Sequence, residues 1–141
     1  MLTLQKIDKT FQPGTVNAHH ALRGVGLTLS DGEFVTIIGS NGAGKSTLLS
    51  AIAGSFFVDR GHILLDGEEL TYVPEHRRAR RIARIFQDPM RGTAPDLTLE
   101  ENVALAYARA GGGLLRPALS RQRRALFREQ LARLNMGLED R

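Results

Sequence analysis

Alternating apolar and polar residues at the start of the chain predict two β-strands. One covers Leu2–Phe11, and the other covers Ala21–Leu29, where Val25, Leu27 and Leu29 fall on one face. Two half-buried strands joined by a short connection favour pairing with each other. We therefore expect the first thirty residues to form an antiparallel β unit.

A continuous apolar run follows the turn residues 30–33. The run Phe34–Ile38 is rich in β-branched residues, which is typical of a strand buried on both faces. After a glycine-rich stretch, apolar residues recur at helical spacing from Ser46, and Gly54 is placed to end that helix. The predicted order is strand, glycine loop, helix.

Shorter elements are predicted in the middle of the chain. His62–Leu65 is expected to form a strand that enters a tight turn at Asp66-Gly67, because this dipeptide readily supplies positive φ values. Pro74 predicts the start of a short basic helix. The segment Ile82–Phe86 alternates as a further strand, which Pro89 would end.

Two helices are predicted toward the end of the chain. Thr98–Glu101 has the spacing of a capping box, and the helix it opens would continue through Tyr107 to the three glycines 111–113. A second, amphipathic helix is expected to begin near Ser120. It would turn four apolar residues to one side, namely Leu126, Phe127, Leu131 and Leu134.

Composition restricts the class of protein. The chain has 141 residues, 42% of them hydrophobic, which suits one domain with a single core. No apolar run approaches the ~20 residues of a membrane-spanning helix, and no secretory leader is recognisable. The absence of cysteine excludes disulfides and cysteine-ligated zinc. We expect a soluble, cytoplasmic chain.

Positive charge is concentrated in the second half, where residues 76–141 hold fourteen Lys/Arg against seven Asp/Glu. A basic segment of this kind can bind nucleic acid. Five of its arginines lack interleaved aromatic residues for base stacking, so a solvated helix face is the simpler interpretation and nucleic acid is not favoured as a partner. These five are Arg77, Arg78, Arg80, Arg81 and Arg84.

Residues 39–46 match the Walker A pattern G-x-x-x-x-G-K-[ST] and lie between a predicted strand and a predicted helix. Glycines let main-chain N–H groups turn toward phosphate oxygens, and the helix adds its positive N-terminal end. The pattern assigns Lys45 to the β- and γ-phosphates, the Ser46 hydroxyl to Mg²⁺ and the Thr47 backbone to the α-phosphate. The predicted nucleotide-binding residues of this loop are Gly39, Ser40, Asn41, Gly42, Ala43, Gly44, Lys45, Ser46 and Thr47.

A phosphate loop alone fits kinases, GTPases, helicases and transport ATPases, so its surroundings decide the class. Residues 41–49 resemble the Walker A region of ATP-binding cassette (ABC) proteins, including the trailing Ser-Thr-Leu-Leu. Four more segments resemble the same family in order: the strand before the loop (21–33), the G-x-I-x-x-x-G hairpin (61–67), the Q-loop (85–89) and the LT-x-x-EN helix start (97–103).

The resemblance implies an α/β fold in which a P-loop NTPase core carries an antiparallel β subdomain and is followed by the beginning of a helical subdomain. The RecA-like and antiparallel part would cover residues 1–97, and the helical part would cover residues 98–141. Residues 84–94 further resemble importers of the tryptophan/tyrosine type.

Two residues outside the loop receive roles from the resemblance. Phe11 falls where the family places an aromatic ring on adenine, whereas the alternative is a core residue, with Val16 or His19 able to fill the same space. Gln87 would contact Mg²⁺ or the attacking water through its amide oxygen and sense the membrane subunit. An exposed glutamine at a strand end is the alternative for Gln87.

By the same resemblance, the chain is the N-terminal part of an ATP-hydrolysing transporter subunit with ATP and Mg²⁺ as cofactors. It would pair with a second ATPase subunit and bind transmembrane permease subunits at the inner face of the membrane. A substrate-binding protein is a further implied partner. Two alternatives remain open: a soluble ABC-type protein acting on the ribosome or DNA, and a regulatory module that binds nucleotide without hydrolysis.

Several family motifs do not occur in these 141 residues: the LSGGQ signature, the Walker B aspartate with its neighbouring glutamate, and the switch histidine. Asp66 and Asp88 do not replace the Walker B aspartate, because neither follows an apolar strand of that type. We expect the 141 residues alone to bind Mg-ATP weakly at best and to hydrolyse none detectably, because phosphoryl transfer needs a positioned water and a fully ligated metal.

Overall fold

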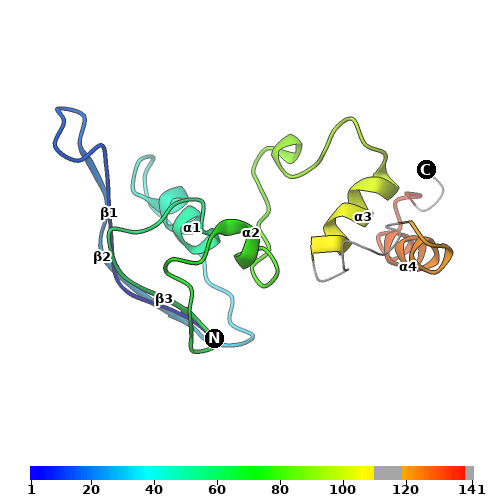
Figure 1. Cartoon of the computed structure of the whole chain (residues 1–141), viewed down its shortest axis with the longest axis horizontal. Coiled ribbons are helices and arrows are strands. Elements are labelled where there is room, and N and C mark those ends of the chain that lie inside the picture. Colours follow the sequence, from blue (N-terminus) through cyan, green and yellow to red (C-terminus); the bar gives the residue numbers. More distant parts are fainter. Residues whose placement is uncertain (110–118, 139–141) are drawn as a thin grey trace. The chain divides into compact units, whose positions relative to one another are not determined.

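The computed structural model describes residues 1–109 and 119–138, and the chain divides into two compact units, Met1–Arg78 and Ala79–Arg141 (Figure 1). The first unit holds a β-sheet and the helix that follows the glycine loop. The second unit holds two longer helices. None of the helices in the described ranges is long and apolar enough to cross a membrane.

A four-stranded antiparallel sheet in the order β2-β1-β3-β4 organises the first unit. Its strands are β1 (Leu2–Phe11), β2 (His19–Leu29), β3 (Arg60–Leu65) and β4 (Glu68–Glu69). In the central strand β1, Leu4 pairs with Leu27 of β2 on one side and with Ile63 of β3 on the other. The predicted pairing of the first two strands is confirmed.

The hairpin predicted at Asp66-Gly67 is also confirmed. These residues have φ values of 52° and 80°, two consecutive positive values that suit a two-residue connection between antiparallel strands. Leu65 pairs with Glu68 directly across the turn. The chain then returns beside β3, because the Leu70 N–H donates to the Ile63 carbonyl at 2.7 Å.

β1 is bulged near its middle, and Gly61 of β3 lies against the bulge. The register shifts between Leu4 and Ile7, and Lys6 adopts a φ of 50°. Gly61 has a φ of +93°, and a Cβ built there would lie 2.4 Å from the carbonyl oxygens of both Gln5 and Lys6. Only glycine allows this close approach of two main chains.

Helix α1 (Lys45–Ala53) follows the glycine loop as predicted and ends at Gly54, whose N–H donates to the carbonyls of Ser50 and Ala51. One side of α1 is buried, and the buried apolar residues of this region are Leu48, Ala51, Ile52, Ala53, Val58 and Leu70. The short basic helix α2 (Glu75–Arg78) begins after Pro74, again as predicted. The solvated-face interpretation of the basic stretch is wrong for Arg78, which is only 1% exposed.

Two predicted strands do not form. Phe34–Ile38 and Ile82–Phe86 are irregular, and several of their apolar side chains face solvent, with exposures of 91% for Phe34, 89% for Ile38 and 97% for Ile85. A strand buried on both faces needs hydrogen-bonded neighbours along its edges and packed layers above and below. Within the described residues no strand pairs with either segment, so the β propensity of these residues is not realised.

The second unit contains the 3₁₀ helix η1 (Pro89–Arg91) and the helices α3 (Leu99–Arg109) and α4 (Arg121–Ala132). Tyr107 of α3 packs edge-on against the buried Phe127 of α4, with ring centroids 5.6 Å apart. The predicted apolar face of α4 is only partly buried, because Leu134 lies beyond the end of the helix and is 56% exposed. The predicted helix stop at residues 111–113 lies outside the described residues.

The capping box before α3 is confirmed. The Thr98 N–H donates to the Glu101 carboxylate at 2.8 Å, and the Glu101 N–H donates to the Thr98 hydroxyl at 3.3 Å. Asn102 then ties the preceding loop to the helix, because its amide accepts the Ala94 N–H at 2.8 Å and donates to the Ala94 carbonyl at 3.0 Å. An amide side chain suits this place because it both donates and accepts.

From the close approach at the bulge, we expect Gly61→Ala to lower the free energy of unfolding of the first unit by about 2–4 kcal/mol. The causes are strain at positive φ and overlap of the new Cβ with the β1 main chain. Gly67→Ala is the matched control, because Gly67 also has positive φ but nothing lies within 4 Å of the point that its Cβ would occupy. The control should cost only about 1–2 kcal/mol of backbone strain. Thermal unfolding followed by circular dichroism would measure both, and equal losses would contradict the role given to the close approach.

Candidate functional site

The last residue of the glycine loop before α1 is Gly44, and no other residue type fits its conformation and surroundings. Gly44 precedes the helix in the left-handed conformation, with a φ of 87° and a ψ of 2°. A Cβ at this position would lie 2.6 Å from the Ala21 carbonyl oxygen of β2. The end of the loop is therefore seated directly on the sheet, and this contact sets where α1 begins.

Lys45 is the first residue of α1, and its side chain turns back over the loop. The ammonium group donates to the carbonyls of Gly39 at 2.6 Å and Ser40 at 2.7 Å. Both acceptors are neutral, so the positive charge is held in place without being neutralised by a carboxylate. A bound anion could replace these two contacts with stronger, charge-assisted ones.

The first turn of α1 adds main-chain donors to this cation. The first amides of an α-helix have no acceptor within the helix, and no side chain caps α1. No acidic residue lies in the first turn, so the positive end of the helix dipole is not offset there. Loop, lysine and helix end together form a site suited to a multiply charged anion such as a polyphosphate.

The first turn also carries the residue predicted to hold a metal. Ser46 is exposed, and Thr47 beside it is half-buried. No cluster of three or more His, Cys, Asp or Glu residues occurs in the part of the chain that the structure describes. Ser46 lies in the first turn of α1 beside the glycine loop, and its assignment to Mg²⁺ stays a prediction.

Phe11 lies at the end of β1 and is 37% exposed. Its ring meets Phe56 edge-on, with centroids 5.3 Å apart and an interplanar angle of 80°. The Lys9 ammonium lies 5.7 Å from the Phe11 centroid and 5.5 Å from that of Phe56. The ring is supported on one side and partly open to solvent, which suits contact with a ligand as well as packing.

The same Lys9 belongs to a group of hydrogen bonds centred on Asp59, which we call the Asp59 anchor. Lys9 donates to an Asp59 carboxylate oxygen at 2.8 Å and to the Phe57 carbonyl at 2.9 Å, and the Thr10 N–H donates to the second Asp59 oxygen at 2.6 Å. The hydrogen bond from Lys9, followed by that from Thr10, lowers the pKa of Asp59. Sequence reasoning missed this group, because no local pattern links Lys9 to residues fifty positions away.

Gln87 belongs to the second unit, where it is exposed and follows the irregular segment Ile82–Phe86. The preceding Phe86 ring is flanked by the guanidinium groups of Arg84 at 4.8 Å and Arg91 at 5.6 Å. Asp88 accepts the Met90 N–H at 3.0 Å, so its carboxylate serves the local turn. The assignment of Gln87 to catalysis and metal binding stays a prediction.

Comparison with known proteins identifies relatives over most of the chain. The family described as ABC transporter matches residues 22–141. A tyrosine transport ATP-binding protein of Clostridioides difficile is 41% identical over 75% of this chain and 42% of its own length. A lipoprotein-releasing system ATP-binding protein of Caulobacter vibrioides is 39% identical over 96% of this chain and 55% of its own length. The chain thus spans about half the length of the curated relatives it matches.

Solved structures agree with this relationship. An ATP-binding cassette solved as a dimer in a post-hydrolysis state, bound to ADP and Pi, is 30% identical with a TM-score of 0.73. The match covers 94% of this chain and 57% of that one. A nucleotide-free cassette from an ABC transporter is 28% identical with a TM-score of 0.62, over 87% of this chain and 44% of that one. The predicted fold class, a P-loop ABC ATPase domain with an antiparallel sheet, is confirmed.

The Asp59 anchor predicts a pH-dependent contribution to stability. Because the pKa of Asp59 is lower in the folded chain, its carboxylate stabilises the fold above the unfolded pKa of about 4, and this contribution is lost as pH falls through the folded value. Asp59→Asn should cost less than about 1 kcal/mol at neutral pH, since solvent screens the pair.

Thermal melts at intervals between about pH 7 and pH 3 would test this, with the gap between variant and unaltered chain closing toward acid pH. Asp96→Asn, which removes the same charge from an exposed loop, is the control and should show a much smaller gap. A gap for Asp59→Asn that stays constant down to low pH would contradict the assignment.

Proposed function

The chain belongs to the ABC transporter family of ATP-binding proteins, and from this premise we propose that residues 39–47 bind Mg-ATP. The observation that carries the proposal is the Lys45 ammonium, held over the glycine loop by two carbonyls at the uncapped start of α1. A glycine turn with only a structural role would not require a positive charge at the positive end of a helix.

Each residue of the loop has a defined task in this proposal. The main-chain N–H groups of residues 39–44 surround the phosphates, and Lys45 releases its two carbonyls to contact the β- and γ-phosphates. The Thr47 N–H donates to the α-phosphate, and the Ser46 hydroxyl ligates Mg²⁺. Mg²⁺, when bound, neutralises charge that develops on the phosphate oxygens. Gln87 is proposed to place its amide oxygen near the metal or the attacking water.

The wider activity is also a proposal, because the chain spans about half of its relatives' length. We propose that the whole protein hydrolyses ATP to drive transport, as a subunit that pairs with a second ATPase and with transmembrane permease subunits at the cytoplasmic face of the membrane. The relatives named as transport, import or lipoprotein-releasing ATP-binding proteins support this. Within the chain, residues 98–141 would begin the helical subdomain.

The subgroup follows from one relative. The 41% identical protein of Clostridioides difficile is described as a tyrosine transport ATP-binding protein, which supports assignment to the tryptophan/tyrosine-type importers. An importer of this kind would take its substrate from a separate binding protein, so a substrate-binding protein is the proposed third partner.

Lys45→Ala is predicted to weaken Mg-ATP binding by roughly 2–3 kcal/mol or more, because it removes a charge-assisted contact to the phosphates. The fold should persist, since the partners of Lys45 lie in its own loop. Titration calorimetry on the 141-residue chain would measure the loss. Lys6→Ala removes the same charge from an exposed position of β1 and should bind ATP normally. Equal affinity of both variants would refute the assignment.

Phe11→Ala is predicted to weaken ATP binding by about 1–3 kcal/mol if the ring stacks on adenine, a range known for base–aromatic contacts. Phe11→Tyr keeps the ring and should bind like the unaltered chain. Affinity for inorganic triphosphate, which has no base, should not change in either variant. If Phe11→Ala lowers the melting temperature but leaves ATP affinity intact, the ring serves only to pack against Phe56.

A further inference from the structure

Arg78, the last residue of α2, is a charged side chain that the fold buries, with 1% exposure. Its guanidinium donates four hydrogen bonds, all to main-chain carbonyls: Val73 at 2.7 Å, Ala51 at 2.8 Å, Ile52 at 2.9 Å and Thr71 at 3.0 Å. Burial lowers the pKa of Arg78, yet an arginine in a protein keeps its charge. Burying a charge costs free energy unless its donors are hydrogen-bonded. The four carbonyls supply those acceptors, so this place suits an arginine.

One pair of these carbonyls belongs to the last turn of α1. Carbonyls at a helix C-terminus have no partner within the helix and lie at the negative end of its dipole, where a cation is favourable. Gly54, which ends α1, lies directly against the arginine, since a Cβ there would approach its Nε to 2.8 Å. Arg78 therefore caps the C-terminal end of α1, the helix that begins at Lys45.

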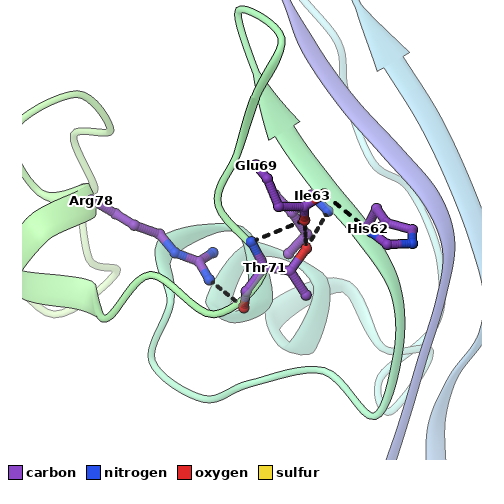
Figure 2. A network of polar contacts seen from close by, with 5 residues as sticks. All are labelled: His62, Ile63, Glu69, Thr71 and Arg78. Atoms are coloured by element: carbon purple, nitrogen blue, oxygen red, sulfur yellow. Dashed lines mark hydrogen bonds and ion pairs between the residues drawn. The ribbon is translucent and has the colours of Figure 1, made fainter.

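The other two carbonyls, those of Thr71 and Val73, belong to the segment after β4. This segment is hydrogen-bonded to the sheet through Thr71. Figure 2 shows Arg78 reaching the Thr71 carbonyl, while the Thr71 hydroxyl accepts the Ile63 N–H of β3 at 2.8 Å. The same hydroxyl donates to Glu69, whose carboxylate also contacts the His62 ring at 3.1 Å. Through this network, Arg78 connects the C-terminal end of α1 to β3.

α1 is thus held at both ends, by Gly44 against the Ala21 carbonyl of β2 and by Arg78 through β3. A nine-residue helix is roughly 13 Å long and moves as a rigid body, so a tilt at one end displaces the other. We propose that Arg78 is a positioning residue for nucleotide binding, which holds α1 so that Lys45 and the first-turn amides face the phosphates. This inference rests on the proposed ATP binding at residues 39–47.

The test compares Arg78→Lys, Arg78→Met and Gly54→Ala with the unaltered chain in titrations with Mg-ATP, at a temperature where circular dichroism shows each to be folded. Arg78→Lys keeps the charge but loses the planar guanidinium that makes the four hydrogen bonds, and Arg78→Met removes the charge as well. Gly54→Ala adds a Cβ 2.8 Å from the Arg78 Nε, at a position of positive φ. Small misplacements of binding groups are costly, so we expect affinity to fall roughly tenfold or more in each variant.

Two controls separate positioning from general stability. Arg77→Met removes an exposed arginine from the same helix, and Ile7→Val loosens the sheet core at a fully buried position. Both should bind ATP like the unaltered chain once corrected for the unfolded fraction. Arg78 variants that also bind normally, or lose affinity only in proportion to unfolding, would overturn the proposal.

Amide hydrogen exchange tests the same claim without ATP. In Arg78→Lys, faster exchange should extend along α1 to the peptide covering residues 39–48, whereas Ile7→Val should leave that peptide protected. Faster exchange confined to residues 51–58 would overturn the inference. If the unaltered chain bound no ATP, the proposed function would fail, and the exchange pattern would still decide whether Arg78 controls the loop end of α1.

Discussion

The pairing of β1 with strands on both of its edges is the interaction on which the rest of the first unit depends. β1 brings β2 and β3, which are far apart in sequence, to opposite sides of the buried residues Leu4 and Ile7. β2 then supplies the surface on which the glycine loop rests, and β3 supplies the network that reaches the far end of α1. The close approach at Gly61 shows how tightly the two main chains must fit.

Two cations at opposite ends of α1 are held in the same way, by neutral main-chain carbonyls, but with different energetic consequences. Arg78 lies at the C-terminal end, where its charge complements the helix dipole and the arrangement is stabilising. Lys45 lies at the N-terminal end, where its charge opposes the dipole. A bound anion would offset this unfavourable interaction at the N-terminal end. The contacts of Arg78 at the C-terminal end are favourable without any ligand.

The aromatic pair at the end of β1 illustrates what local reasoning can and cannot reach. The family pattern is enough to make Phe11 a candidate, but its support by Phe56 and Lys9 depends on the turn between α1 and β3. The basic stretch likewise predicts a solvated face for Arg78. Its burial follows from carbonyls on segments up to twenty-seven residues away, which no periodicity of that stretch reveals.

Sequence was sufficient for the features that depend on local chemistry: the first two strands, the Asp66-Gly67 turn, the end of α1 at Gly54, the capping box at Thr98 and the phosphate-loop pattern itself. Each of these rests on residues within a few positions of one another. Tertiary structure alone decided that Phe34–Ile38 and Ile82–Phe86 form no strand and that Arg78 is buried. The physical reason is the same in both cases, because strand pairing and the burial of a charge require partners that the local sequence does not contain.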